Sequence, residues 1–238
     1  MMTTHGQALE NFNARTDQNV RHIIFNNSSK SYNVFDTQTL DELEILITDI
    51  EEKDYKLVVF SSAKEGFIVG ADIKEFNMSS TQDIEAMVIR GQKLFNRIED
   101  LSIPSIAIIN GTAMGGGLEL CLACTARLCL ENSQVALPEI KLGVLPAWGG
   151  TTRLPRLIGL ANALDLICSG RTVTSYEALK MGIVSSIIED IDEIDLSICY
   201  DDGKERKKGA IVSENAFKAL ATFKLTKNFI SKKTGGNY

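Results

Sequence analysis

Short apolar runs alternate with longer amphipathic segments along much of the chain. Runs rich in β-branched residues predict buried strands, and apolar residues repeated at helical spacing predict helices that pack by one face. The last predicted helix begins at a run of glycines. This pattern predicts strands at residues 20–25, 57–60, 105–109, 127–130 and 134–137, and helices at 36–51, 81–101 and 118–123.

The order of these elements predicts an α/β fold. Strands and helices that follow one another indicate right-handed crossovers and a mainly parallel sheet. Active sites in such sheets lie beyond the carboxyl ends of the strands. Two segments are candidate parts of an active site for this reason: the loop at residues 61–75 and the turn that begins at Asn110.

The loop at 61–75 contains an apolar stretch, FIVGA, between polar residues. Loops on a rigid scaffold often carry function. Exposure of this stretch to water would be costly, so it must pack or line a pocket. Asp72 has a structural alternative, because it can cap a helix that starts near Ile73.

The turn after residue 109 contains three successive glycines at 115–117. Glycine allows backbone conformations closed to other residues and lets a ligand approach bare N–H groups. The start of the following helix carries unpaired N–H groups and a partial positive charge, which favour a developing anion. The fingerprints of P-loops and dinucleotide sites are absent. A glycine turn needed only for close packing is an equal alternative.

Two glutamates near this turn are candidate catalytic residues. Glu119 lies in the first turn of an apolar helix, where a carboxylate is rarely buried unless it is paired or used. Glu139 follows Pro138 in a predicted loop. Two such groups suit chemistry in which one gives a proton and the other takes one. The structural alternatives are a helix-dipole partner for Glu119 and an exposed loop acid for Glu139.

Composition limits the classes of function. The 238 residues fit one large α/β domain with a small appendage, and 44% are hydrophobic. A net charge of −6 and a pI near 5.1 argue against a general nucleic-acid binder. No apolar run is long enough for a membrane span, and residues 1–19 lack a signal-peptide core. We therefore expect a cytoplasmic protein.

Cysteine and histidine offer little chemistry. Four of the five cysteines (Cys121, Cys124, Cys129 and Cys168) have apolar sequence neighbours and are expected to be small core residues. Cys121 and Cys124 form a C-x-x-C motif, but a second pair for zinc is missing. With only two histidines, neither a catalytic triad nor a histidine metal site is predicted.

Three longer motifs carry a family resemblance: FIVGADIKE at 67–75, NGTAMGGGLE at 110–119 and LPEIKLGVLP at 137–146, followed by GGTTRLP at 149–155. Together they resemble the enoyl-CoA hydratase (crotonase) superfamily, and most of all the N-terminal hydratase domain of multifunctional fatty-acid-oxidation α subunits. The resemblance implies a ββα-spiral fold with a C-terminal helical segment. The ending at 232–238 also resembles the exit toward a dehydrogenase, so a fragment or truncated relative is expected.

The resemblance also implies roles for individual residues. Glu119 and Glu139 match the paired catalytic glutamates, which hold one water between them. The oxyanion hole would use the N–H groups of Val69 and Gly116. Expected substrate-binding residues are Phe67, Gly70, Ala71, Asp72, Gly115, Leu145 and Trp148, although Trp148 is equally well explained as a core residue. The nucleotide end of coenzyme A would lie along residues 32–35 and 67–72.

By this resemblance the protein hydrates trans-2-enoyl-CoA to 3-hydroxyacyl-CoA. A Δ3,Δ2-enoyl-CoA isomerase and a non-catalytic acyl-CoA-binding module are the alternatives. No metal or other cofactor is expected, because coenzyme A enters as part of the substrate. The expected partners are copies of the chain, as a trimer or hexamer, or a thiolase subunit in a multifunctional protein. The expected segments are a core at 1–190, a charged loop at 191–212 and a helix at 213–238.

Overall fold

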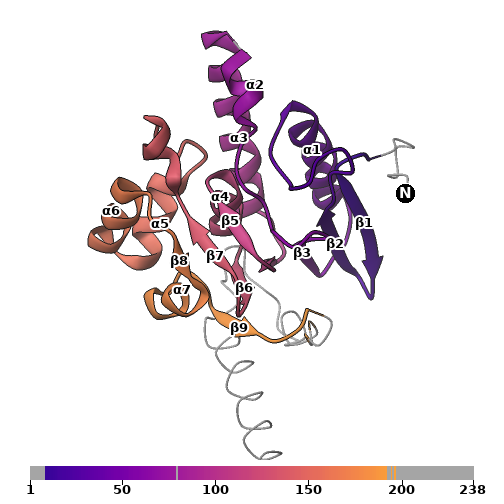
Figure 1. The fold of residues 1–238 in the computed structure, drawn as a ribbon. Coiled ribbons are helices and arrows are strands. Elements are labelled where there is room, and N and C mark those ends of the chain that lie inside the picture. Colours follow the sequence, from indigo (N-terminus) through magenta and orange to yellow (C-terminus); the bar gives the residue numbers. More distant parts are fainter. Residues whose placement is uncertain (1–8, 79, 192–193, 195, 197–238) are drawn as a thin grey trace, which may run out of the picture.

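The computed structural model describes residues 9–78, 80–191, 194 and 196, and Figure 1 shows the course of the chain. The elements named below all belong to the predicted core of residues 1–190. The predicted charged loop at 191–212 and helix at 213–238 lie almost entirely outside the described residues. The division into three segments therefore stays a prediction.

A six-stranded sheet forms the centre of the fold. Its strands lie in the order β1-β2-β3-β4-β6-β9. β1 and β2 are antiparallel, whereas all the other neighbouring pairs are parallel. The predicted α/β fold with a mainly parallel sheet is thus confirmed. The strands are β1 (Phe12–Asp17), β2 (Val20–Phe25), β3 (Leu57–Ser62), β4 (Ser105–Ile109), β6 (Ala126–Leu130) and β9 (Ser186–Ile188).

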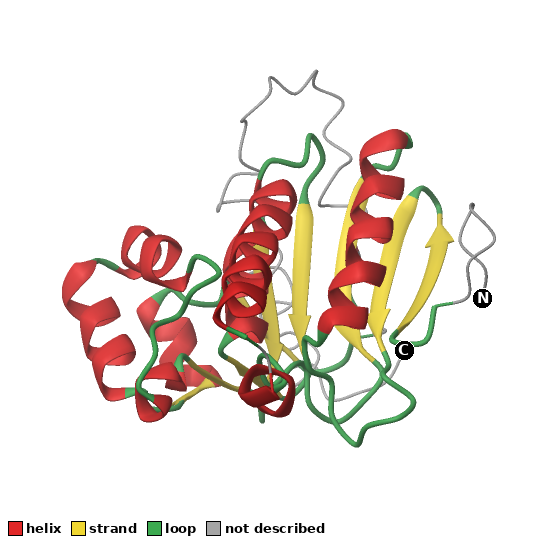
Figure 2. Ribbon diagram, turned by 90° about the horizontal axis from the view of Figure 1, so that it is seen from above, coloured by secondary structure: helices red, strands yellow, loops and turns green. Residues whose placement is uncertain are grey.

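Strands β3 and β4 are buried along their whole length, which explains their apolar runs at 57–60 and 106–109. Phe60 and Ala107 face the larger core, beneath helices that cover one side of the sheet (Figure 2). Val59 and Ile106 pair in register and face a second apolar cluster on the other side. The covering helices are α1 (Thr37–Glu52), α3 (Thr81–Glu99) and α4 (Gly116–Ala123).

A small second sheet and several short helices extend the fold beyond the central sheet. The strands of the second sheet have the order β5-β7-β8. No described helix is both long enough and apolar enough to cross a membrane. The additional elements are β5 (Thr112–Met114), β7 (Gln134–Ala136), β8 (Val173–Thr174), α2 (Ile73–Met78), the 3₁₀ helix η1 (Pro138–Leu142), α5 (Gly150–Ile158), α6 (Leu160–Ser169) and α7 (Ser175–Met181).

Helix caps set the limits of the two long helices. Asp36 precedes α1 and accepts a hydrogen bond from the Thr39 N–H at 2.8 Å. Ser80 and Asp83 form a reciprocal capping box at the start of α3. The N–H of Asp100 closes α3 on the Asn96 carbonyl, so the helix ends at Glu99 and not at residue 101 as predicted. These caps satisfy N–H groups that a helix cannot satisfy internally.

One strand was not predicted, and one expectation is wrong. The polar start of the chain contains strand β1, which places Phe12 and Ala14 in the core while its other side chains remain exposed. Only two residues of this strand are buried, so its apolar pattern was too short to be recognised in the sequence. Cys168 is exposed on α6, whereas Cys121 and Cys129 are buried as expected.

Gly117 allows α4 to cross the segment after β3 at close range. A Cβ atom at Gly117 would lie 2.2 Å from the Ile68 carbonyl oxygen, which is backbone and cannot swing away. We predict that Gly117→Ala lowers the free energy of unfolding by about 1–3 kcal/mol, because overpacking outweighs the roughly 1 kcal/mol that alanine adds to helix propensity.

Urea unfolding followed by circular dichroism measures this effect. Gly66→Ala is the matched control, since the nearest atom to a Cβ there is 3.9 Å away. Equal stabilities of the two variants would contradict the close contact at Gly117.

Candidate active site

Two backbone segments meet at the predicted site. The Phe67 N–H donates to the Thr112 carbonyl at 3.0 Å, and the Met114 N–H donates to the Ile68 carbonyl at 2.9 Å. Beyond these bonds both chains turn at glycines. A Cβ atom at Gly70 would lie 3.4 Å from the Met114 oxygen and 3.9 Å from the Gly116 nitrogen. The structure therefore brings together the FIVGA loop and the glycine turn.

The Val69 N–H is already occupied. It donates to the Asn33 carbonyl at 3.0 Å, and the Asp72 N–H donates to the Phe35 carbonyl at 2.9 Å. A donor engaged in this way is not available to a ligand without breaking a backbone hydrogen bond. The prediction that Val69 supplies an oxyanion-hole N–H is therefore wrong for this structure.

Ala71 is better placed for that role. It forms a parallel bridge with Phe35, in which the Gly70 carbonyl and the Asp72 N–H face the partner backbone. Since peptide groups alternate in direction along an extended chain, the Ala71 N–H points away from Phe35, toward the side of the glycine turn. No described residue accepts a hydrogen bond from this N–H or from that of Gly116.

Gly116 is the first residue of α4, where N–H groups lack intrahelical acceptors. Its preceding residue, Gly115, has φ of 53°, a left-handed value that favours glycine. The Ala71 and Gly116 amides thus form a pair of free donors on adjoining turns. Such a pair can stabilise negative charge that develops on a carbonyl oxygen.

Glu119 is buried, with 2% of its surface exposed. One oxygen, Oε1, accepts hydrogen bonds from the N–H groups of Trp148 and Gly150, both at 2.8 Å. Burial raises the pKa of Glu119 from 4.5 to about 7, with a further rise from the Glu139 charge, while the two amides and Arg153 oppose the increase. A carboxyl group that titrates near neutrality is suited to proton transfer.

Glu139 lies on η1, and its carboxyl group approaches Gly115. A Cβ atom at Gly115 would be 3.1 Å from the Glu139 Oε1, a tight contact at a position whose positive φ also favours glycine. Its Oε2 is buried and has no hydrogen-bond partner among the described residues. Burial also raises the pKa of Glu139. An unpaired buried oxygen is costly and requires an explanation, so the alternative of an exposed loop acid does not fit.

Several predicted substrate-binding residues have other roles. Phe67 is completely buried and packs edge-on against Phe25. The Trp148 ring lies in the core, 5% exposed, with its edge against Phe35 and Phe95. The core alternative for Trp148 is therefore the better one, and Phe67 does not line an open pocket.

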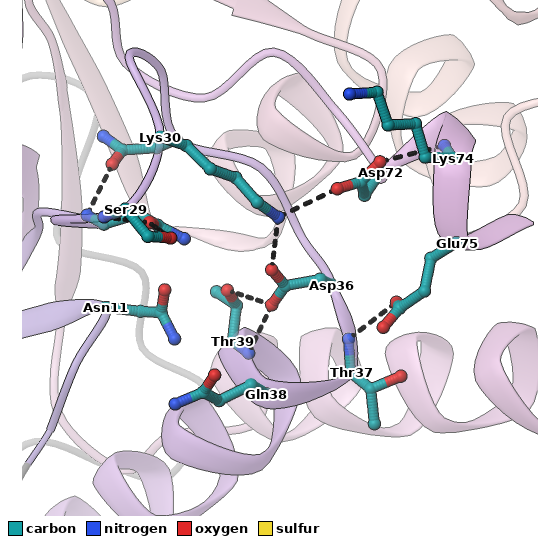
Figure 3. Close-up of polar contacts among 12 residues, drawn as sticks. Asn11, Ser29, Lys30, Asp36, Thr37, Gln38, Thr39, Asp72, Lys74 and Glu75 are labelled. Carbon is teal, nitrogen blue, oxygen red and sulfur yellow. Dashed lines mark hydrogen bonds and ion pairs between the residues drawn. The ribbon is translucent and has the colours of Figure 1, made fainter.

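Asp72 is engaged on both carboxylate oxygens. Its Oδ1 accepts from the Lys74 N–H at 2.9 Å, consistent with the predicted cap of α2. Its Oδ2 binds the Lys30 ammonium at 2.8 Å, and the same ammonium binds Asp36 at 2.6 Å (Figure 3). Lys30 lowers the pKa of Asp72. Asp72 therefore acts as a structural residue, which leaves little capacity for a ligand.

Leu145 is 63% exposed, and its neighbours Leu142 and Val144 are exposed as well. This open apolar surface follows η1, on which Glu139 lies. The position is compatible with the predicted acyl contact, which stays a prediction. The parts of the chain that the structure describes contain no cluster of three or more His, Cys, Asp or Glu side chains able to hold a metal.

Comparison with known proteins identifies the family. The model of the family described as enoyl-CoA hydratase/isomerase matches residues 6–197. The chain belongs to the enoyl-CoA hydratase/isomerase family. A relative in Pseudomonas putida (strain GB-1), the fatty acid oxidation complex subunit alpha, is 36% identical over 237 residues, which cover 93% of this chain and 33% of the relative. The chain thus spans about a third of the length of the curated relatives it matches.

Solved structures agree with this assignment. The enoyl-CoA hydratase of Geobacillus kaustophilus HTA426 has a TM-score of 0.74 at 30% identity, covering 77% of this chain and 70% of that one. The enoyl-CoA hydratase of Bacillus anthracis has a TM-score of 0.72 at 29% identity, covering 95% and 84%. The crotonase-like fold implied by the sequence motifs is confirmed.

The raised pKa of Glu119 predicts a pH-dependent effect of Glu119→Gln on stability. Because the folded protein favours the protonated carboxyl, Glu119 stabilises the fold fully below pH 4.5 and loses this contribution as pH rises through about 7. Glutamine keeps the acceptor oxygen but does not ionise. The free energy of unfolding of the variant, relative to wild type, should rise by about 2–3 kcal/mol between pH 5 and 8.

Denaturant unfolding at several pH values measures this difference. The control for the loss of one carboxylate is Glu52→Gln, at the exposed end of α1. Parallel pH curves for Glu119→Gln and wild type would show that Glu119 titrates normally.

Proposed function

We propose that this protein catalyses the reversible hydration of trans-2-enoyl-CoA to 3-hydroxyacyl-CoA, as a step of fatty-acid β-oxidation. The observation that carries the proposal is the pair of glutamates beside the glycine turn. One is buried, paired with amides and titrates near neutrality, and the other presents an unpaired buried oxygen. The family and the fatty-acid-oxidation relatives support the same reaction.

In the proposed mechanism, the thioester oxygen accepts hydrogen bonds from the Ala71 and Gly116 amides. Charge that moves onto this oxygen during addition is then stabilised without side-chain rearrangement. Preorganised donors of this kind typically contribute about 3–4 kcal/mol each. The loss of conjugation is thus coupled to formation of an enolate-like thioester.

The two glutamates have different roles in the proposed addition of water. Glu119 has Oε1 fixed by two amides, and its Oε2 orients and activates the water. The water oxygen bonds to the β-carbon, and Glu139 delivers a proton to the α-carbon. Glu119 takes the proton that the water gives up, so the pair of glutamates holds one proton before and after the addition, and return of this proton to Glu139 restores the starting state. The reverse reaction removes the α-proton through Glu139 and expels water.

Isomerisation of 3-enoyl-CoA to 2-enoyl-CoA is the second candidate. It requires one carboxylate that removes a proton at the α-carbon and returns it at the γ-carbon. The unpaired Oε2 of Glu139 favours this activity, because it is free to carry a proton. The same oxyanion donors would stabilise the dienolate, so one site can support both reactions.

The relatives are subunits of a fatty acid oxidation complex, so we propose a role in such an assembly. The expected association with a thiolase subunit or with other copies of the chain, and the expected lack of a cofactor, stay predictions.

Substitution of each glutamate tests the reaction. Glu139→Gln should lower kcat/KM for 2-enoyl-CoA hydration and for 3-enoyl-CoA isomerisation by about 10²–10⁴-fold. Glu119→Gln should reduce hydration to a similar extent but leave most of the isomerase activity, because isomerisation needs no water. Loss of the conjugated-thioester absorbance measures hydration, and its appearance measures isomerisation.

Glu52→Gln again serves as the control for the loss of one carboxylate and should retain both activities. Binding of acyl-CoA by the wild type without turnover of either substrate would favour the alternative of a non-catalytic binding module. Equal loss of both activities in Glu119→Gln would contradict the division of roles.

A further inference from the structure

The backbone of the 147–150 turn, which comprises Ala147 to Gly150, binds Glu119 through its N–H groups and other residues through its carbonyls. The N–H groups of Trp148 and Gly150 face inward and bind the Oε1 of Glu119. The carbonyls of Ala147, Trp148 and Gly149 accept hydrogen bonds from other groups. The position of Glu119 therefore depends on whatever holds these carbonyls.

Gln92 holds the first carbonyl. Its Nε2 donates to the Ala147 oxygen at 2.7 Å. The Ala147 carbonyl and the Trp148 N–H belong to the same peptide group, so the hydrogen bonds run in series from Gln92 through this peptide to Glu119. Hydrogen bonds in series polarise and strengthen one another. Gln92 itself is exposed on α3 and makes no contribution to the core.

Arg153 holds the second carbonyl. Its Nη1 donates to the Trp148 oxygen at 2.9 Å, while Nε binds Glu99 at 2.8 Å and Nη2 binds Asn96 at 2.6 Å. The guanidinium thus ties the turn to α3 by a planar fork that lysine cannot reproduce. The third carbonyl, of Gly149, accepts from the N–H of Arg153 at 2.8 Å as α5 begins.

Helix α3 contacts the turn through two adjacent residues, Gly91 and Gln92. A Cβ atom at Gly91 would lie 2.4 Å from the Trp148 indole, so the ring can pack here only against glycine. The next residue is Gln92, which reaches the neighbouring carbonyl. Adjacent positions on one helix therefore fix the side chain and the backbone of the turn.

We propose that Gln92 and Arg153 are positioning residues for Glu119, which hold the 147–150 turn so that its two amides face the Glu119 carboxylate. The consequence for hydration rests on the proposed function, whereas the effect on Glu119 itself does not. Neither residue touches the reacting atoms. Their action passes through the backbone of the turn.

The charged groups around Glu119 predict the direction of the effect. Glu139 on η1 raises the pKa of Glu119, and Arg153 on α5 lowers it; Arg153 is in turn paired with Glu99 of α3. Loss of the Gln92 donor weakens the amide hydrogen bond to the ionised carboxylate without altering these charges. The pKa of Glu119 should then rise further above its usual value.

The decisive experiment compares Gln92→Met and Gln92→Glu with wild type in the full chain. Methionine keeps the length of the side chain without a donor, and glutamate replaces the donor by an acceptor. Gln82→Met and Gln82→Glu are matched controls, since Gln82 is also exposed on α3 and lies far along the helix from the turn. Infrared pH titration follows the Glu119 carboxyl band, assigned as the band that Glu119→Gln removes.

Gln92→Met should raise the titration midpoint of Glu119 by roughly half a pH unit to one, and Gln92→Glu should raise it more. The kcat for hydration should fall about threefold to tenfold with little change in KM, while isomerisation is largely spared. The Gln82 variants should match wild type in both measurements.

Arg153→Lys provides an independent variant, in which the charge is kept and the fork is lost. It should also raise the Glu119 midpoint, at a pH where denaturant unfolding shows the variant to be folded. Unchanged midpoints in both Gln92 variants and in folded Arg153→Lys would overturn the proposal. A shifted midpoint in a protein that hydrates no enoyl thioester would support the positioning role while refuting the proposed function.

Discussion

The hydrogen bonds between the Glu119 carboxylate and the Trp148 and Gly150 amides join the parts of the site. They connect α4 to the turn before α5, and so link elements separated by 29 and 31 residues in the chain. A buried carboxylate without these donors would pay a large desolvation cost. The amides reduce this cost without removing it, and the pKa near 7 is the result of the balance.

The two glutamates differ in how well they are satisfied. Glu119 is fixed by backbone groups, whereas Glu139 has an oxygen that no described residue binds. Stability alone would favour an apolar residue or an added donor at Glu139. Retention of an unpaired carboxylate beside free amides is characteristic of a site that is completed by a ligand or by water. The unpaired oxygen of Glu139 thus lowers local stability but can bind a ligand or a water molecule.

Much of the fold followed from the hydrophobic pattern. The strands at 20–25 and 105–109 agree with β2 and β4 to the residue, because both are rich in β-branched apolar residues, which favour strands. β1 escaped prediction because an edge strand buries only alternate residues. The glycine turn and Glu119 were recognisable, since a carboxylate in an apolar helix is unusual, whereas the role of Glu139 followed from the family resemblance.

The details of the site depended on tertiary contacts that local sequence does not encode. The choice between Val69 and Ala71 as donor is decided by pairing with residues 33–35, which lie far away in the sequence. The role of Asp72 changed because Lys30 reaches it across 42 positions. Likewise, the partners of Glu119 lie on a turn whose sequence carried the family resemblance but did not indicate a carboxylate-binding function. Only the buried position of Glu119 signalled that such partners must exist.

Trp148 is the only tryptophan in the chain, and its indole packs where a Cβ atom on Gly116 would clash. The same residue provides a backbone donor to Glu119. Its intrinsic fluorescence therefore reports on the candidate active site. Binding of a ligand at the Ala71 and Gly116 amides, or displacement of the turn, would alter the emission of this one indole without any added label.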